Sequence, residues 1–198
     1  MPERPLNGRY TSIAVVLHWL VAIGIIFNLW KGLGFDALEA AHPDRIGAAV
    51  GLHKSIGITV IGLVILRVLW KIGHPGPAPL PALKPWERKL STGVHHLLYL
   101  LMLVVPLAGW LHDSAWKAGA AHPLVLFRVI PWFRFPFFSG LSDAGKDYWH
   151  DLFGGVHTIT AYVLIGALVL HVAGALKHQF VDKQSEFARM GIGRRKPA

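Results

Sequence analysis

The chain contains no cysteine and few charged residues. None of its 198 residues is Cys, and only 16% are Asp, Glu, Lys or Arg, whereas soluble domains carry about 25%. The absence of cysteine excludes disulfides, iron–sulfur clusters and thiolate-bound zinc. The scarcity of charge, beside 53% hydrophobic residues, favours a membrane protein. Histidine is abundant instead, with 12 copies.

Four stretches are long and apolar enough to cross a membrane, for which a helix needs about 20 residues. We predict helices at about 11–30, 51–70, 93–112 and 155–176. The fold class is then all-α, with one integral membrane domain over residues 1–198 built as a four-helix bundle. A secretory signal peptide is the alternative for the first stretch, but no small-x-small cleavage site follows Trp30.

Two connections between these stretches differ in length and composition. Residues 73–89, GHPGPAPLPALKPWERK, are rich in proline and indicate a loop. Residues 113–154 form a longer connection that contains LFRVIPWFRFPFF. Aromatic residues mixed with arginine suit the lipid headgroup layer. We therefore expect this segment to lie on the membrane surface or to form a small soluble lid.

Lysine and arginine are distributed unevenly between the two ends of the predicted helices. The end that carries both chain termini has 13 of them, and the other end has 7 together with seven of the eleven acidic residues. The positive-inside rule places the richer side in the cytoplasm. We therefore expect cytoplasmic N and C termini and a long periplasmic loop between the third and fourth helices. This distribution accounts for the net charge of +9 without a nucleic-acid partner.

Six histidines lie inside or at the edge of the apolar stretches: His18, His53, His95, His96, His157 and His171. A buried imidazole is costly unless it has a polar partner. His157 and His171 are 14 residues apart, which is roughly 21 Å along a helix and only about 40° around it. One helix face therefore presents two imidazoles, one near each membrane surface.

Depth in the membrane pairs these histidines across the bundle. His18 and His171 each lie roughly 10 Å from the cytoplasmic end of their helix, whereas His53 and His157 both lie near the outer end. Two facing imidazoles, found twice, suit bis-histidine binding of haem b. Hydrogen-bonded structural histidines are one alternative. Zinc or copper is another, but it requires three or four ligands at one depth.

Several motifs resemble one known family along nearly the whole chain. They are HWLVA (18–22), LHKSIGI (52–58), LRVLW (66–70), HHLLYLLMLVVPLAGW (95–110), PWFRF (131–135) and LHVAGALKHQFVDKQSEFARM (170–190). The chain resembles the bacterial cytochrome b-561 family, which are four-helix di-haem cytochromes of the inner membrane. The resemblance implies two haem b groups whose iron is bound axially by His18, His53, His157 and His171. It also implies electron exchange with the quinone pool, with ubiquinone as the acceptor.

Four further residues are candidates for contacts with a haem propionate or with quinone. His95 and His178 match histidines of the family, and His178 follows His171 by seven residues on nearly the same helix face. Lys54 and Arg67 are candidates because a cation near a membrane end commonly binds an anion there. Structural or solvated histidines are the alternative for the first two. For Arg67, the simpler account is that it extends to the lipid headgroups.

The resemblance leaves more than one function open. One branch of the family resembles superoxide oxidase, which passes an electron from superoxide outside the cell to ubiquinone. Other relatives resemble cytochrome b subunits that collect electrons from a donor protein such as a dehydrogenase or hydrogenase. A haem or metal carrier without redox turnover is a third class. The short single domain favours a stand-alone protein, and an anionic substrate would be attracted outside by cations at Lys54, Lys117, Arg128, Arg134 and Lys146.

Overall fold

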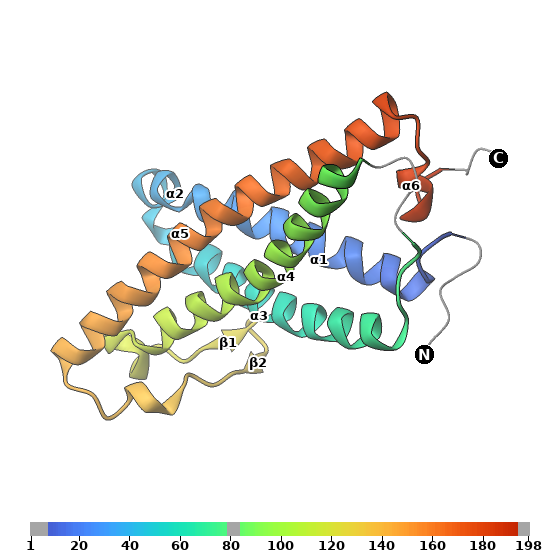
Figure 1. The fold of residues 1–198 in the computed structure, drawn as a ribbon. Helices are drawn as coiled ribbons and strands as arrows, with labels where there is room; N and C mark the ends of the chain where they lie inside the picture. Colours follow the sequence, from blue (N-terminus) through green and yellow to red (C-terminus); the bar gives the residue numbers. More distant parts are fainter. Residues whose placement is uncertain (1–7, 79–83, 194–198) are drawn as a thin grey trace.

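The computed structural model describes residues 8–78 and 84–193, and their regular structure is almost entirely helical (Figure 1). The elements are α1 (Ser12–Leu33), α2 (Phe35–Ala41), α3 (Pro43–Gly73), α4 (Pro85–Ser114), η1 (Lys117–Ala120), β1 (Val125–Leu126), β2 (Ile130–Pro131), η2 (Pro136–Phe138), α5 (Asp143–Leu176), η3 (Lys177–Val181) and α6 (Glu186–Arg189). The strands β1 and β2 form one small antiparallel hairpin. The prediction of an all-α protein with four long apolar helices is therefore confirmed.

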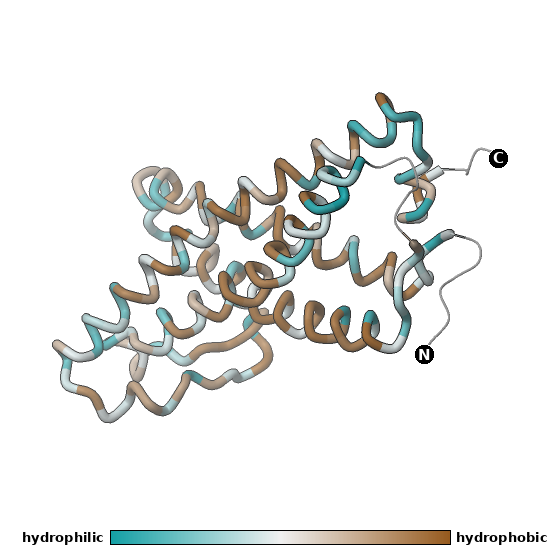
Figure 2. The backbone as a smooth tube through the Cα atoms, in the orientation of Figure 1, coloured by the Kyte–Doolittle hydropathy of each residue, from teal (hydrophilic) through white to brown (hydrophobic). Residues whose placement is uncertain are grey.

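The four long helices α1, α3, α4 and α5 are each long and apolar enough to span a membrane. Figure 2 shows hydrophobic residues along their lengths and hydrophilic residues gathered toward their ends. Many large apolar side chains face outward: Ile23 is 64% exposed and Val169 is 62% exposed. Helices that are apolar on all sides are typical of a lipid surrounding.

The helices extend beyond their predicted bounds where polar residues continue them. The fourth was predicted to begin near 155, but α5 begins at Asp143, where the Ser142 hydroxyl accepts a hydrogen bond from the Gly145 N–H at 3.2 Å. The third was predicted to begin near 93, but α4 begins at Pro85, and the Glu87 carboxylate accepts from the Lys84 N–H at 3.0 Å. Hydropathy finds only the apolar part of a helix, so these capped polar turns escaped it.

The connection between α4 and α5 is shorter than predicted and folds as a small cap on the bundle. It comprises η1, the β1–β2 hairpin and η2, and contains no helix of the kind that lies flat on a membrane surface. The Trp110 indole donates to the Phe133 carbonyl at 2.9 Å, and its ring lies 4.6 Å from that of Phe135. The Phe127 N–H donates to the Ser55 hydroxyl at 2.8 Å. These contacts fasten the cap to α3 and α4.

The two ends of the bundle are chemically distinct. At one end, here called the terminal end, the start of α1, the end of α3, the start of α4, the end of α5 and α6 come together (Figure 1). The Trp70 indole there donates to the Thr11 hydroxyl at 2.8 Å, and the Lys177 ammonium donates to Glu87 at 2.8 Å. The opposite end carries the cap and is called the cap end. The first and last of the four long helices thus begin and end, respectively, at the same end of the bundle, as four crossings require; which end faces the cytoplasm stays a prediction.

The helices pack as two pairs. α4 runs along α5, α1 runs along α3, and α3 joins the pairs through α4. The core at these contacts is aliphatic and includes Val21, Val60, Val64, Leu98, Leu101 and Leu164. α1 and α3 are closely packed at Gly24, where an added Cβ would lie 2.9 Å from a methyl of Val60.

We predict that Gly24→Ala destabilises the bundle by about 1–3 kcal/mol, because the new methyl group must force α1 away from Val60. Gly62→Ala on α3 is the matched control, since its added Cβ meets nothing within 4 Å, and alanine favours the helix by about 0.5–1 kcal/mol. Denaturant unfolding of both variants in detergent, followed by circular dichroism, measures the difference. Equal stability of the two variants would show that the α1–α3 contact is not tight at Gly24.

Candidate functional site

Two pairs of imidazole rings face each other between the helices. The His53 ring on α3 and the His157 ring on α5 have centres 6.0 Å apart, near the cap end. The His18 ring on α1 and the His171 ring on α5 have centres 6.2 Å apart, near the terminal end. The structure therefore brings together the same partners that depth in the membrane predicted. Whether they bind haem iron stays a prediction.

The spacing of each pair fits one metal ion between two rings. An ion bound to opposite imidazole nitrogens at about 2 Å each holds the ring centres about 6 Å apart. Among the described residues, no group of three or more His, Asp or Glu side chains converges as a metal site. The alternative of a zinc or copper site with three or four protein ligands therefore has no supporting geometry in residues 8–78 and 84–193.

A cavity of about 660 Å³ surrounds the cap-end pair and is lined by all four long helices. The Nδ1 atom of His157 donates to the Val105 carbonyl at 2.8 Å; because a carbonyl only accepts, this nitrogen carries the proton. Its Nε2 is thereby left without a proton and can bind a metal. The Nδ1 atom of His53 is buried and has no hydrogen-bond partner in the described structure.

Glycine makes space for these rings. A Cβ at Gly109 would lie 2.9 Å from the Nδ1 atom of His157, and one at Gly32 would lie 3.5 Å from Cε1 of His53. The lining of the cavity is mainly apolar, with residues such as Ile25 and Leu164. A mainly apolar cavity with two facing imidazoles suits a flat apolar group whose metal takes two axial nitrogens.

The terminal-end pair has a third histidine beside it. The His95 ring on α4 lies 5.1 Å from the His171 ring at an angle of 89°, and its Nδ1 donates to the Ser91 carbonyl at 2.6 Å. His95 therefore flanks the pair instead of facing His18. Arg67 on α3 donates through Nε to the hydroxyl of Tyr99 at 3.1 Å, and Tyr99 follows His95 by four residues on α4.

His178 follows the terminal-end pair in η3, a short π-helical turn that extends α5. Its Nδ1 lies 2.7 Å from the Asp182 carboxylate, so this nitrogen carries a proton and Nε2 is presented to its surroundings. Lys177 bridges the same carboxylate at 2.7 Å and Glu87 at 2.8 Å. These hydrogen bonds from Lys177 and His178 hold the pKa of Asp182 below its usual range.

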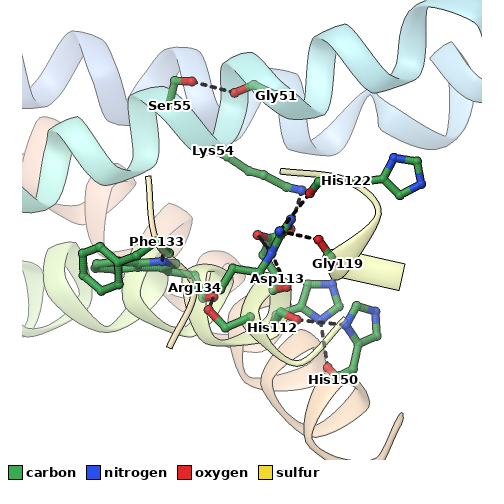
Figure 3. A network of polar contacts seen from close by, with 12 residues as sticks. Gly51, Lys54, Ser55, His112, Asp113, Gly119, His122, Phe133, Arg134 and His150 are labelled. Carbon is green, nitrogen blue, oxygen red and sulfur yellow. Dashed lines mark hydrogen bonds and ion pairs between the residues drawn. The ribbon is translucent and has the colours of Figure 1, made fainter. Parts of the chain in front are cut away.

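Lys54 meets a protein carboxylate at the cap end. Its ammonium forms an ion pair with Asp113, which is 4% exposed. Arg134 approaches the same carboxylate at 2.9 Å and also donates to the carbonyls of Gly119 and His122 (Figure 3). Asp113 is thus the centre of a cluster that ties the cap to α3 and α4. Because its charge is already balanced, Lys54 is a weaker candidate for a propionate than the sequence indicated.

Two functional-looking features were not predicted from the sequence. Asp113 is one of seven acids at its end of the bundle, and only its place at the edge of an apolar stretch distinguished it. His112 and His150 form a reciprocal pair in which each Nδ1 donates to the other's backbone carbonyl, at 2.8 and 2.9 Å (Figure 3). Their rings stack with centres 3.7 Å apart and join α4 to α5. The two residues are 38 apart in sequence, and no local pattern connects them.

Comparison with known proteins shows the family of the chain. Residues 9–193 match the prokaryotic cytochrome b561 family. The chain belongs to this family. It is 34% identical to cytochrome b561 homolog 2 of Escherichia coli over 92% of the chain and 90% of that protein. It is 32% identical to cytochrome b562 of Cereibacter sphaeroides over 61% of the chain and 81% of that protein.

A more distant relative carries a more specific name. The chain is 26% identical to a protein of Yersinia pestis named probable superoxide oxidase CybB, over 93% of the chain and 97% of that protein. Membership of the cytochrome b561 family makes this chain a b-type membrane cytochrome, and the four candidate membrane spans agree with that. The predicted resemblance and membrane location are therefore confirmed.

We predict that Asp113→Ala destabilises this cytochrome b561 by about 3 kcal/mol, because it leaves Lys54 and Arg134 partly buried without a counter-ion. Asp147→Ala is the matched control, since its pair with Lys117 is about half exposed and contributes no more than about 1 kcal/mol. Denaturant unfolding in detergent measures both changes. A loss for Asp113→Ala no larger than that for Asp147→Ala would remove Asp113 from the centre of the cap's attachment.

Proposed function

We propose that this protein is a di-haem electron carrier that exchanges electrons with quinone across the membrane. This proposal is supported by two sets of facing imidazole rings, whose centres are 6.0 and 6.2 Å apart. One ring of each set belongs to α5, and the two sets lie at different positions along that helix. His53 and His157 would hold one haem b, and His18 and His171 the other. Haem iron bound in this way supplies one-electron redox chemistry.

The protein's own residues set the protonation and position of these ligands. The Val105 carbonyl fixes the proton of His157 on Nδ1, which orients Nε2 into the cavity. Gly109 lets that ring lie against α4, where a Cβ would displace it. His157 and His171 are 14 positions apart, which places the two sites roughly 21 Å apart along α5. One continuous helix therefore holds both sites at a fixed separation.

The distribution of Lys and Arg favours electron flow from the cap end to the terminal end. The terminal end carries the larger number and is proposed to face the cytoplasm. His178 is the proposed contact for a quinone headgroup there, because Asp182 fixes its Nδ1 proton and leaves Nε2 available. The donor would meet the cap-end pair first.

Two electron donors are proposed, and the cap has one feature that supports each of them. Superoxide is supported by the name of the Yersinia pestis relative and by a cavity of about 540 Å³ lined by Lys54, Arg128 and Arg134. Two of these three cations are already paired with Asp113, so the attraction for an anion is weaker than the sequence indicated. A partner protein is the second candidate, supported by exposed apolar residues on the cap, such as Val129 at 77% and Phe137 at 67%.

Single substitutions test the two-site proposal. We predict that His171→Ala removes the haem at the terminal end and leaves the other, and that His53→Ala does the reverse, because each pair is independent. Absorbance and electron paramagnetic resonance spectra of the purified variants measure which component disappears. Loss of the same spectral component in both variants would contradict the pairing. Binding of a cofactor supports the folded state, so circular dichroism must first show that each variant is folded.

A second prediction concerns His178. We expect His178→Ala to slow reoxidation of the haems by ubiquinone about 10-fold or more while leaving their reduction by an outside donor unchanged, because one or more hydrogen bonds to the quinone are lost. His74→Ala is the control, since His74 is an exposed histidine at the same end that stacks on Trp70. Stopped-flow absorbance with each substrate supplied separately measures both rates. Normal reoxidation in His178→Ala would exclude His178, and slowed reduction would indicate that the ends are reversed.

A further inference from the structure

Arg67 carries a charge that no carboxylate balances. It lies six residues before the end of α3, which is roughly 9 Å along the helix and inside the span. Its Nε donates to the neutral Tyr99 hydroxyl at 3.1 Å, but its Nη1 atom is buried and has no hydrogen-bond partner. Among the described residues, no acidic side chain lies within 4.0 Å of this guanidinium.

Two other cations near the bundle ends are paired with carboxylates. Lys54 is paired with Asp113, and Lys177 is paired with both Glu87 and Asp182. A guanidinium at membrane depth is costly unless an anion or several acceptors meet it. If Arg67 simply extended to the headgroups, its terminal nitrogens would be accessible, but Nη1 is enclosed. The missing counter-charge is therefore expected from a ligand.

The position of Arg67 indicates which ligand supplies that charge. Arg67 is linked to the terminal-end pair through α4: its Nε donates to Tyr99, and Tyr99 lies one helical turn after His95, whose ring is 5.1 Å from that of His171. Tyr99 on α4 contacts the guanidinium, whose central carbon, Cζ, lies 5.7 Å from the centre of the Tyr99 ring. A guanidinium presents a fork of donors that matches a carboxylate. Haem b carries two carboxylates, its propionates.

We propose that Arg67 is the counter-ion of a propionate of the haem held between His18 and His171, and that it raises the reduction potential of that haem. This inference rests on the proposed function. It assigns the role to Arg67 and not to Lys54, although the sequence offered both. Tyr99 is the positioning residue that orients the guanidinium.

The test uses Arg67→Gln in the purified holoprotein, in a His53→Ala background so that only the terminal-end haem contributes. Redox titration of the haem absorbance should show a lower midpoint potential, because loss of a nearby positive charge favours the more positive oxidised haem. Lys71→Gln is the matched control, since Lys71 lies one turn further along α3, is exposed, and sits 4.4 Å above the same Tyr99 ring. The shift of the midpoint potential in Lys71→Gln should be several times smaller than that in Arg67→Gln. Arg67→Lys should restore most of the potential.

Infrared spectroscopy separates a direct contact from a long-range charge effect. Haem labelled with carbon-13 in its propionate carboxyls identifies the propionate bands in the oxidised-minus-reduced spectrum. These bands should move in Arg67→Gln and stay in place in Lys71→Gln. Unmoved bands, or equal potential shifts in the two variants, would overturn the inference. Where Arg67→Gln does not assemble, Arg67→Lys and Tyr99→Phe are expected to shift the same bands, and unmoved bands in both would overturn it.

The same measurements distinguish this inference from the function on which it rests. An Arg67→Gln variant that keeps the haem content of the His53→Ala background and shows an unchanged potential would contradict the role of Arg67 alone. A His53→Ala protein that retains no haem at all would contradict the two-site proposal instead. An unchanged potential in Arg67→Gln leaves the assignment of His18 and His171 as ligands intact, whereas loss of all haem in His53→Ala contradicts that assignment.

Discussion

Polar groups buried in an apolar bundle must be satisfied by the protein or by what it binds, and this constraint explains most of the structure. Water is not available inside the span, so each imidazole and each charge needs a partner there. The Nδ1 atom of His157 donates to the Val105 carbonyl, and the other side of the ring faces the His53 imidazole, with ring centres 6.0 Å apart. His18 and His171 face each other in the same way. A bis-histidine haem at each level would complete both pairs.

The same constraint orders the charged residues. At the cap end, Asp113 balances Lys54 and Arg134 and thereby fixes the cap above the cavity. At the terminal end, Asp182 and Glu87 balance Lys177, and Asp182 also orients His178. Arg67 has no such carboxylate, and its enclosed Nη1 atom indicates that part of the balance comes from a bound group.

Part of this arrangement could be predicted from the sequence, because it depends on local composition and helical spacing. The four apolar helices followed from hydropathy, and the partners of His157 and His171 followed from the depth of each residue in its helix. The polar turns that begin α4 and α5 could not be found in this way, since capping residues such as Ser142 carry no hydropathy signal. The Asp113 cluster and the His112–His150 pair depend on which residues the tertiary fold brings together.

The central claim is that each chain holds two haems, one in each imidazole pair. The most direct test is the ratio of haem to polypeptide in the purified protein, with haem measured by the pyridine haemochrome assay and protein by quantitative amino-acid analysis. The account predicts about two haem b groups per chain, one for each pair of axial histidines. A ratio near one would show that one pair holds no haem, and a protein that is purified folded without haem would contradict the account.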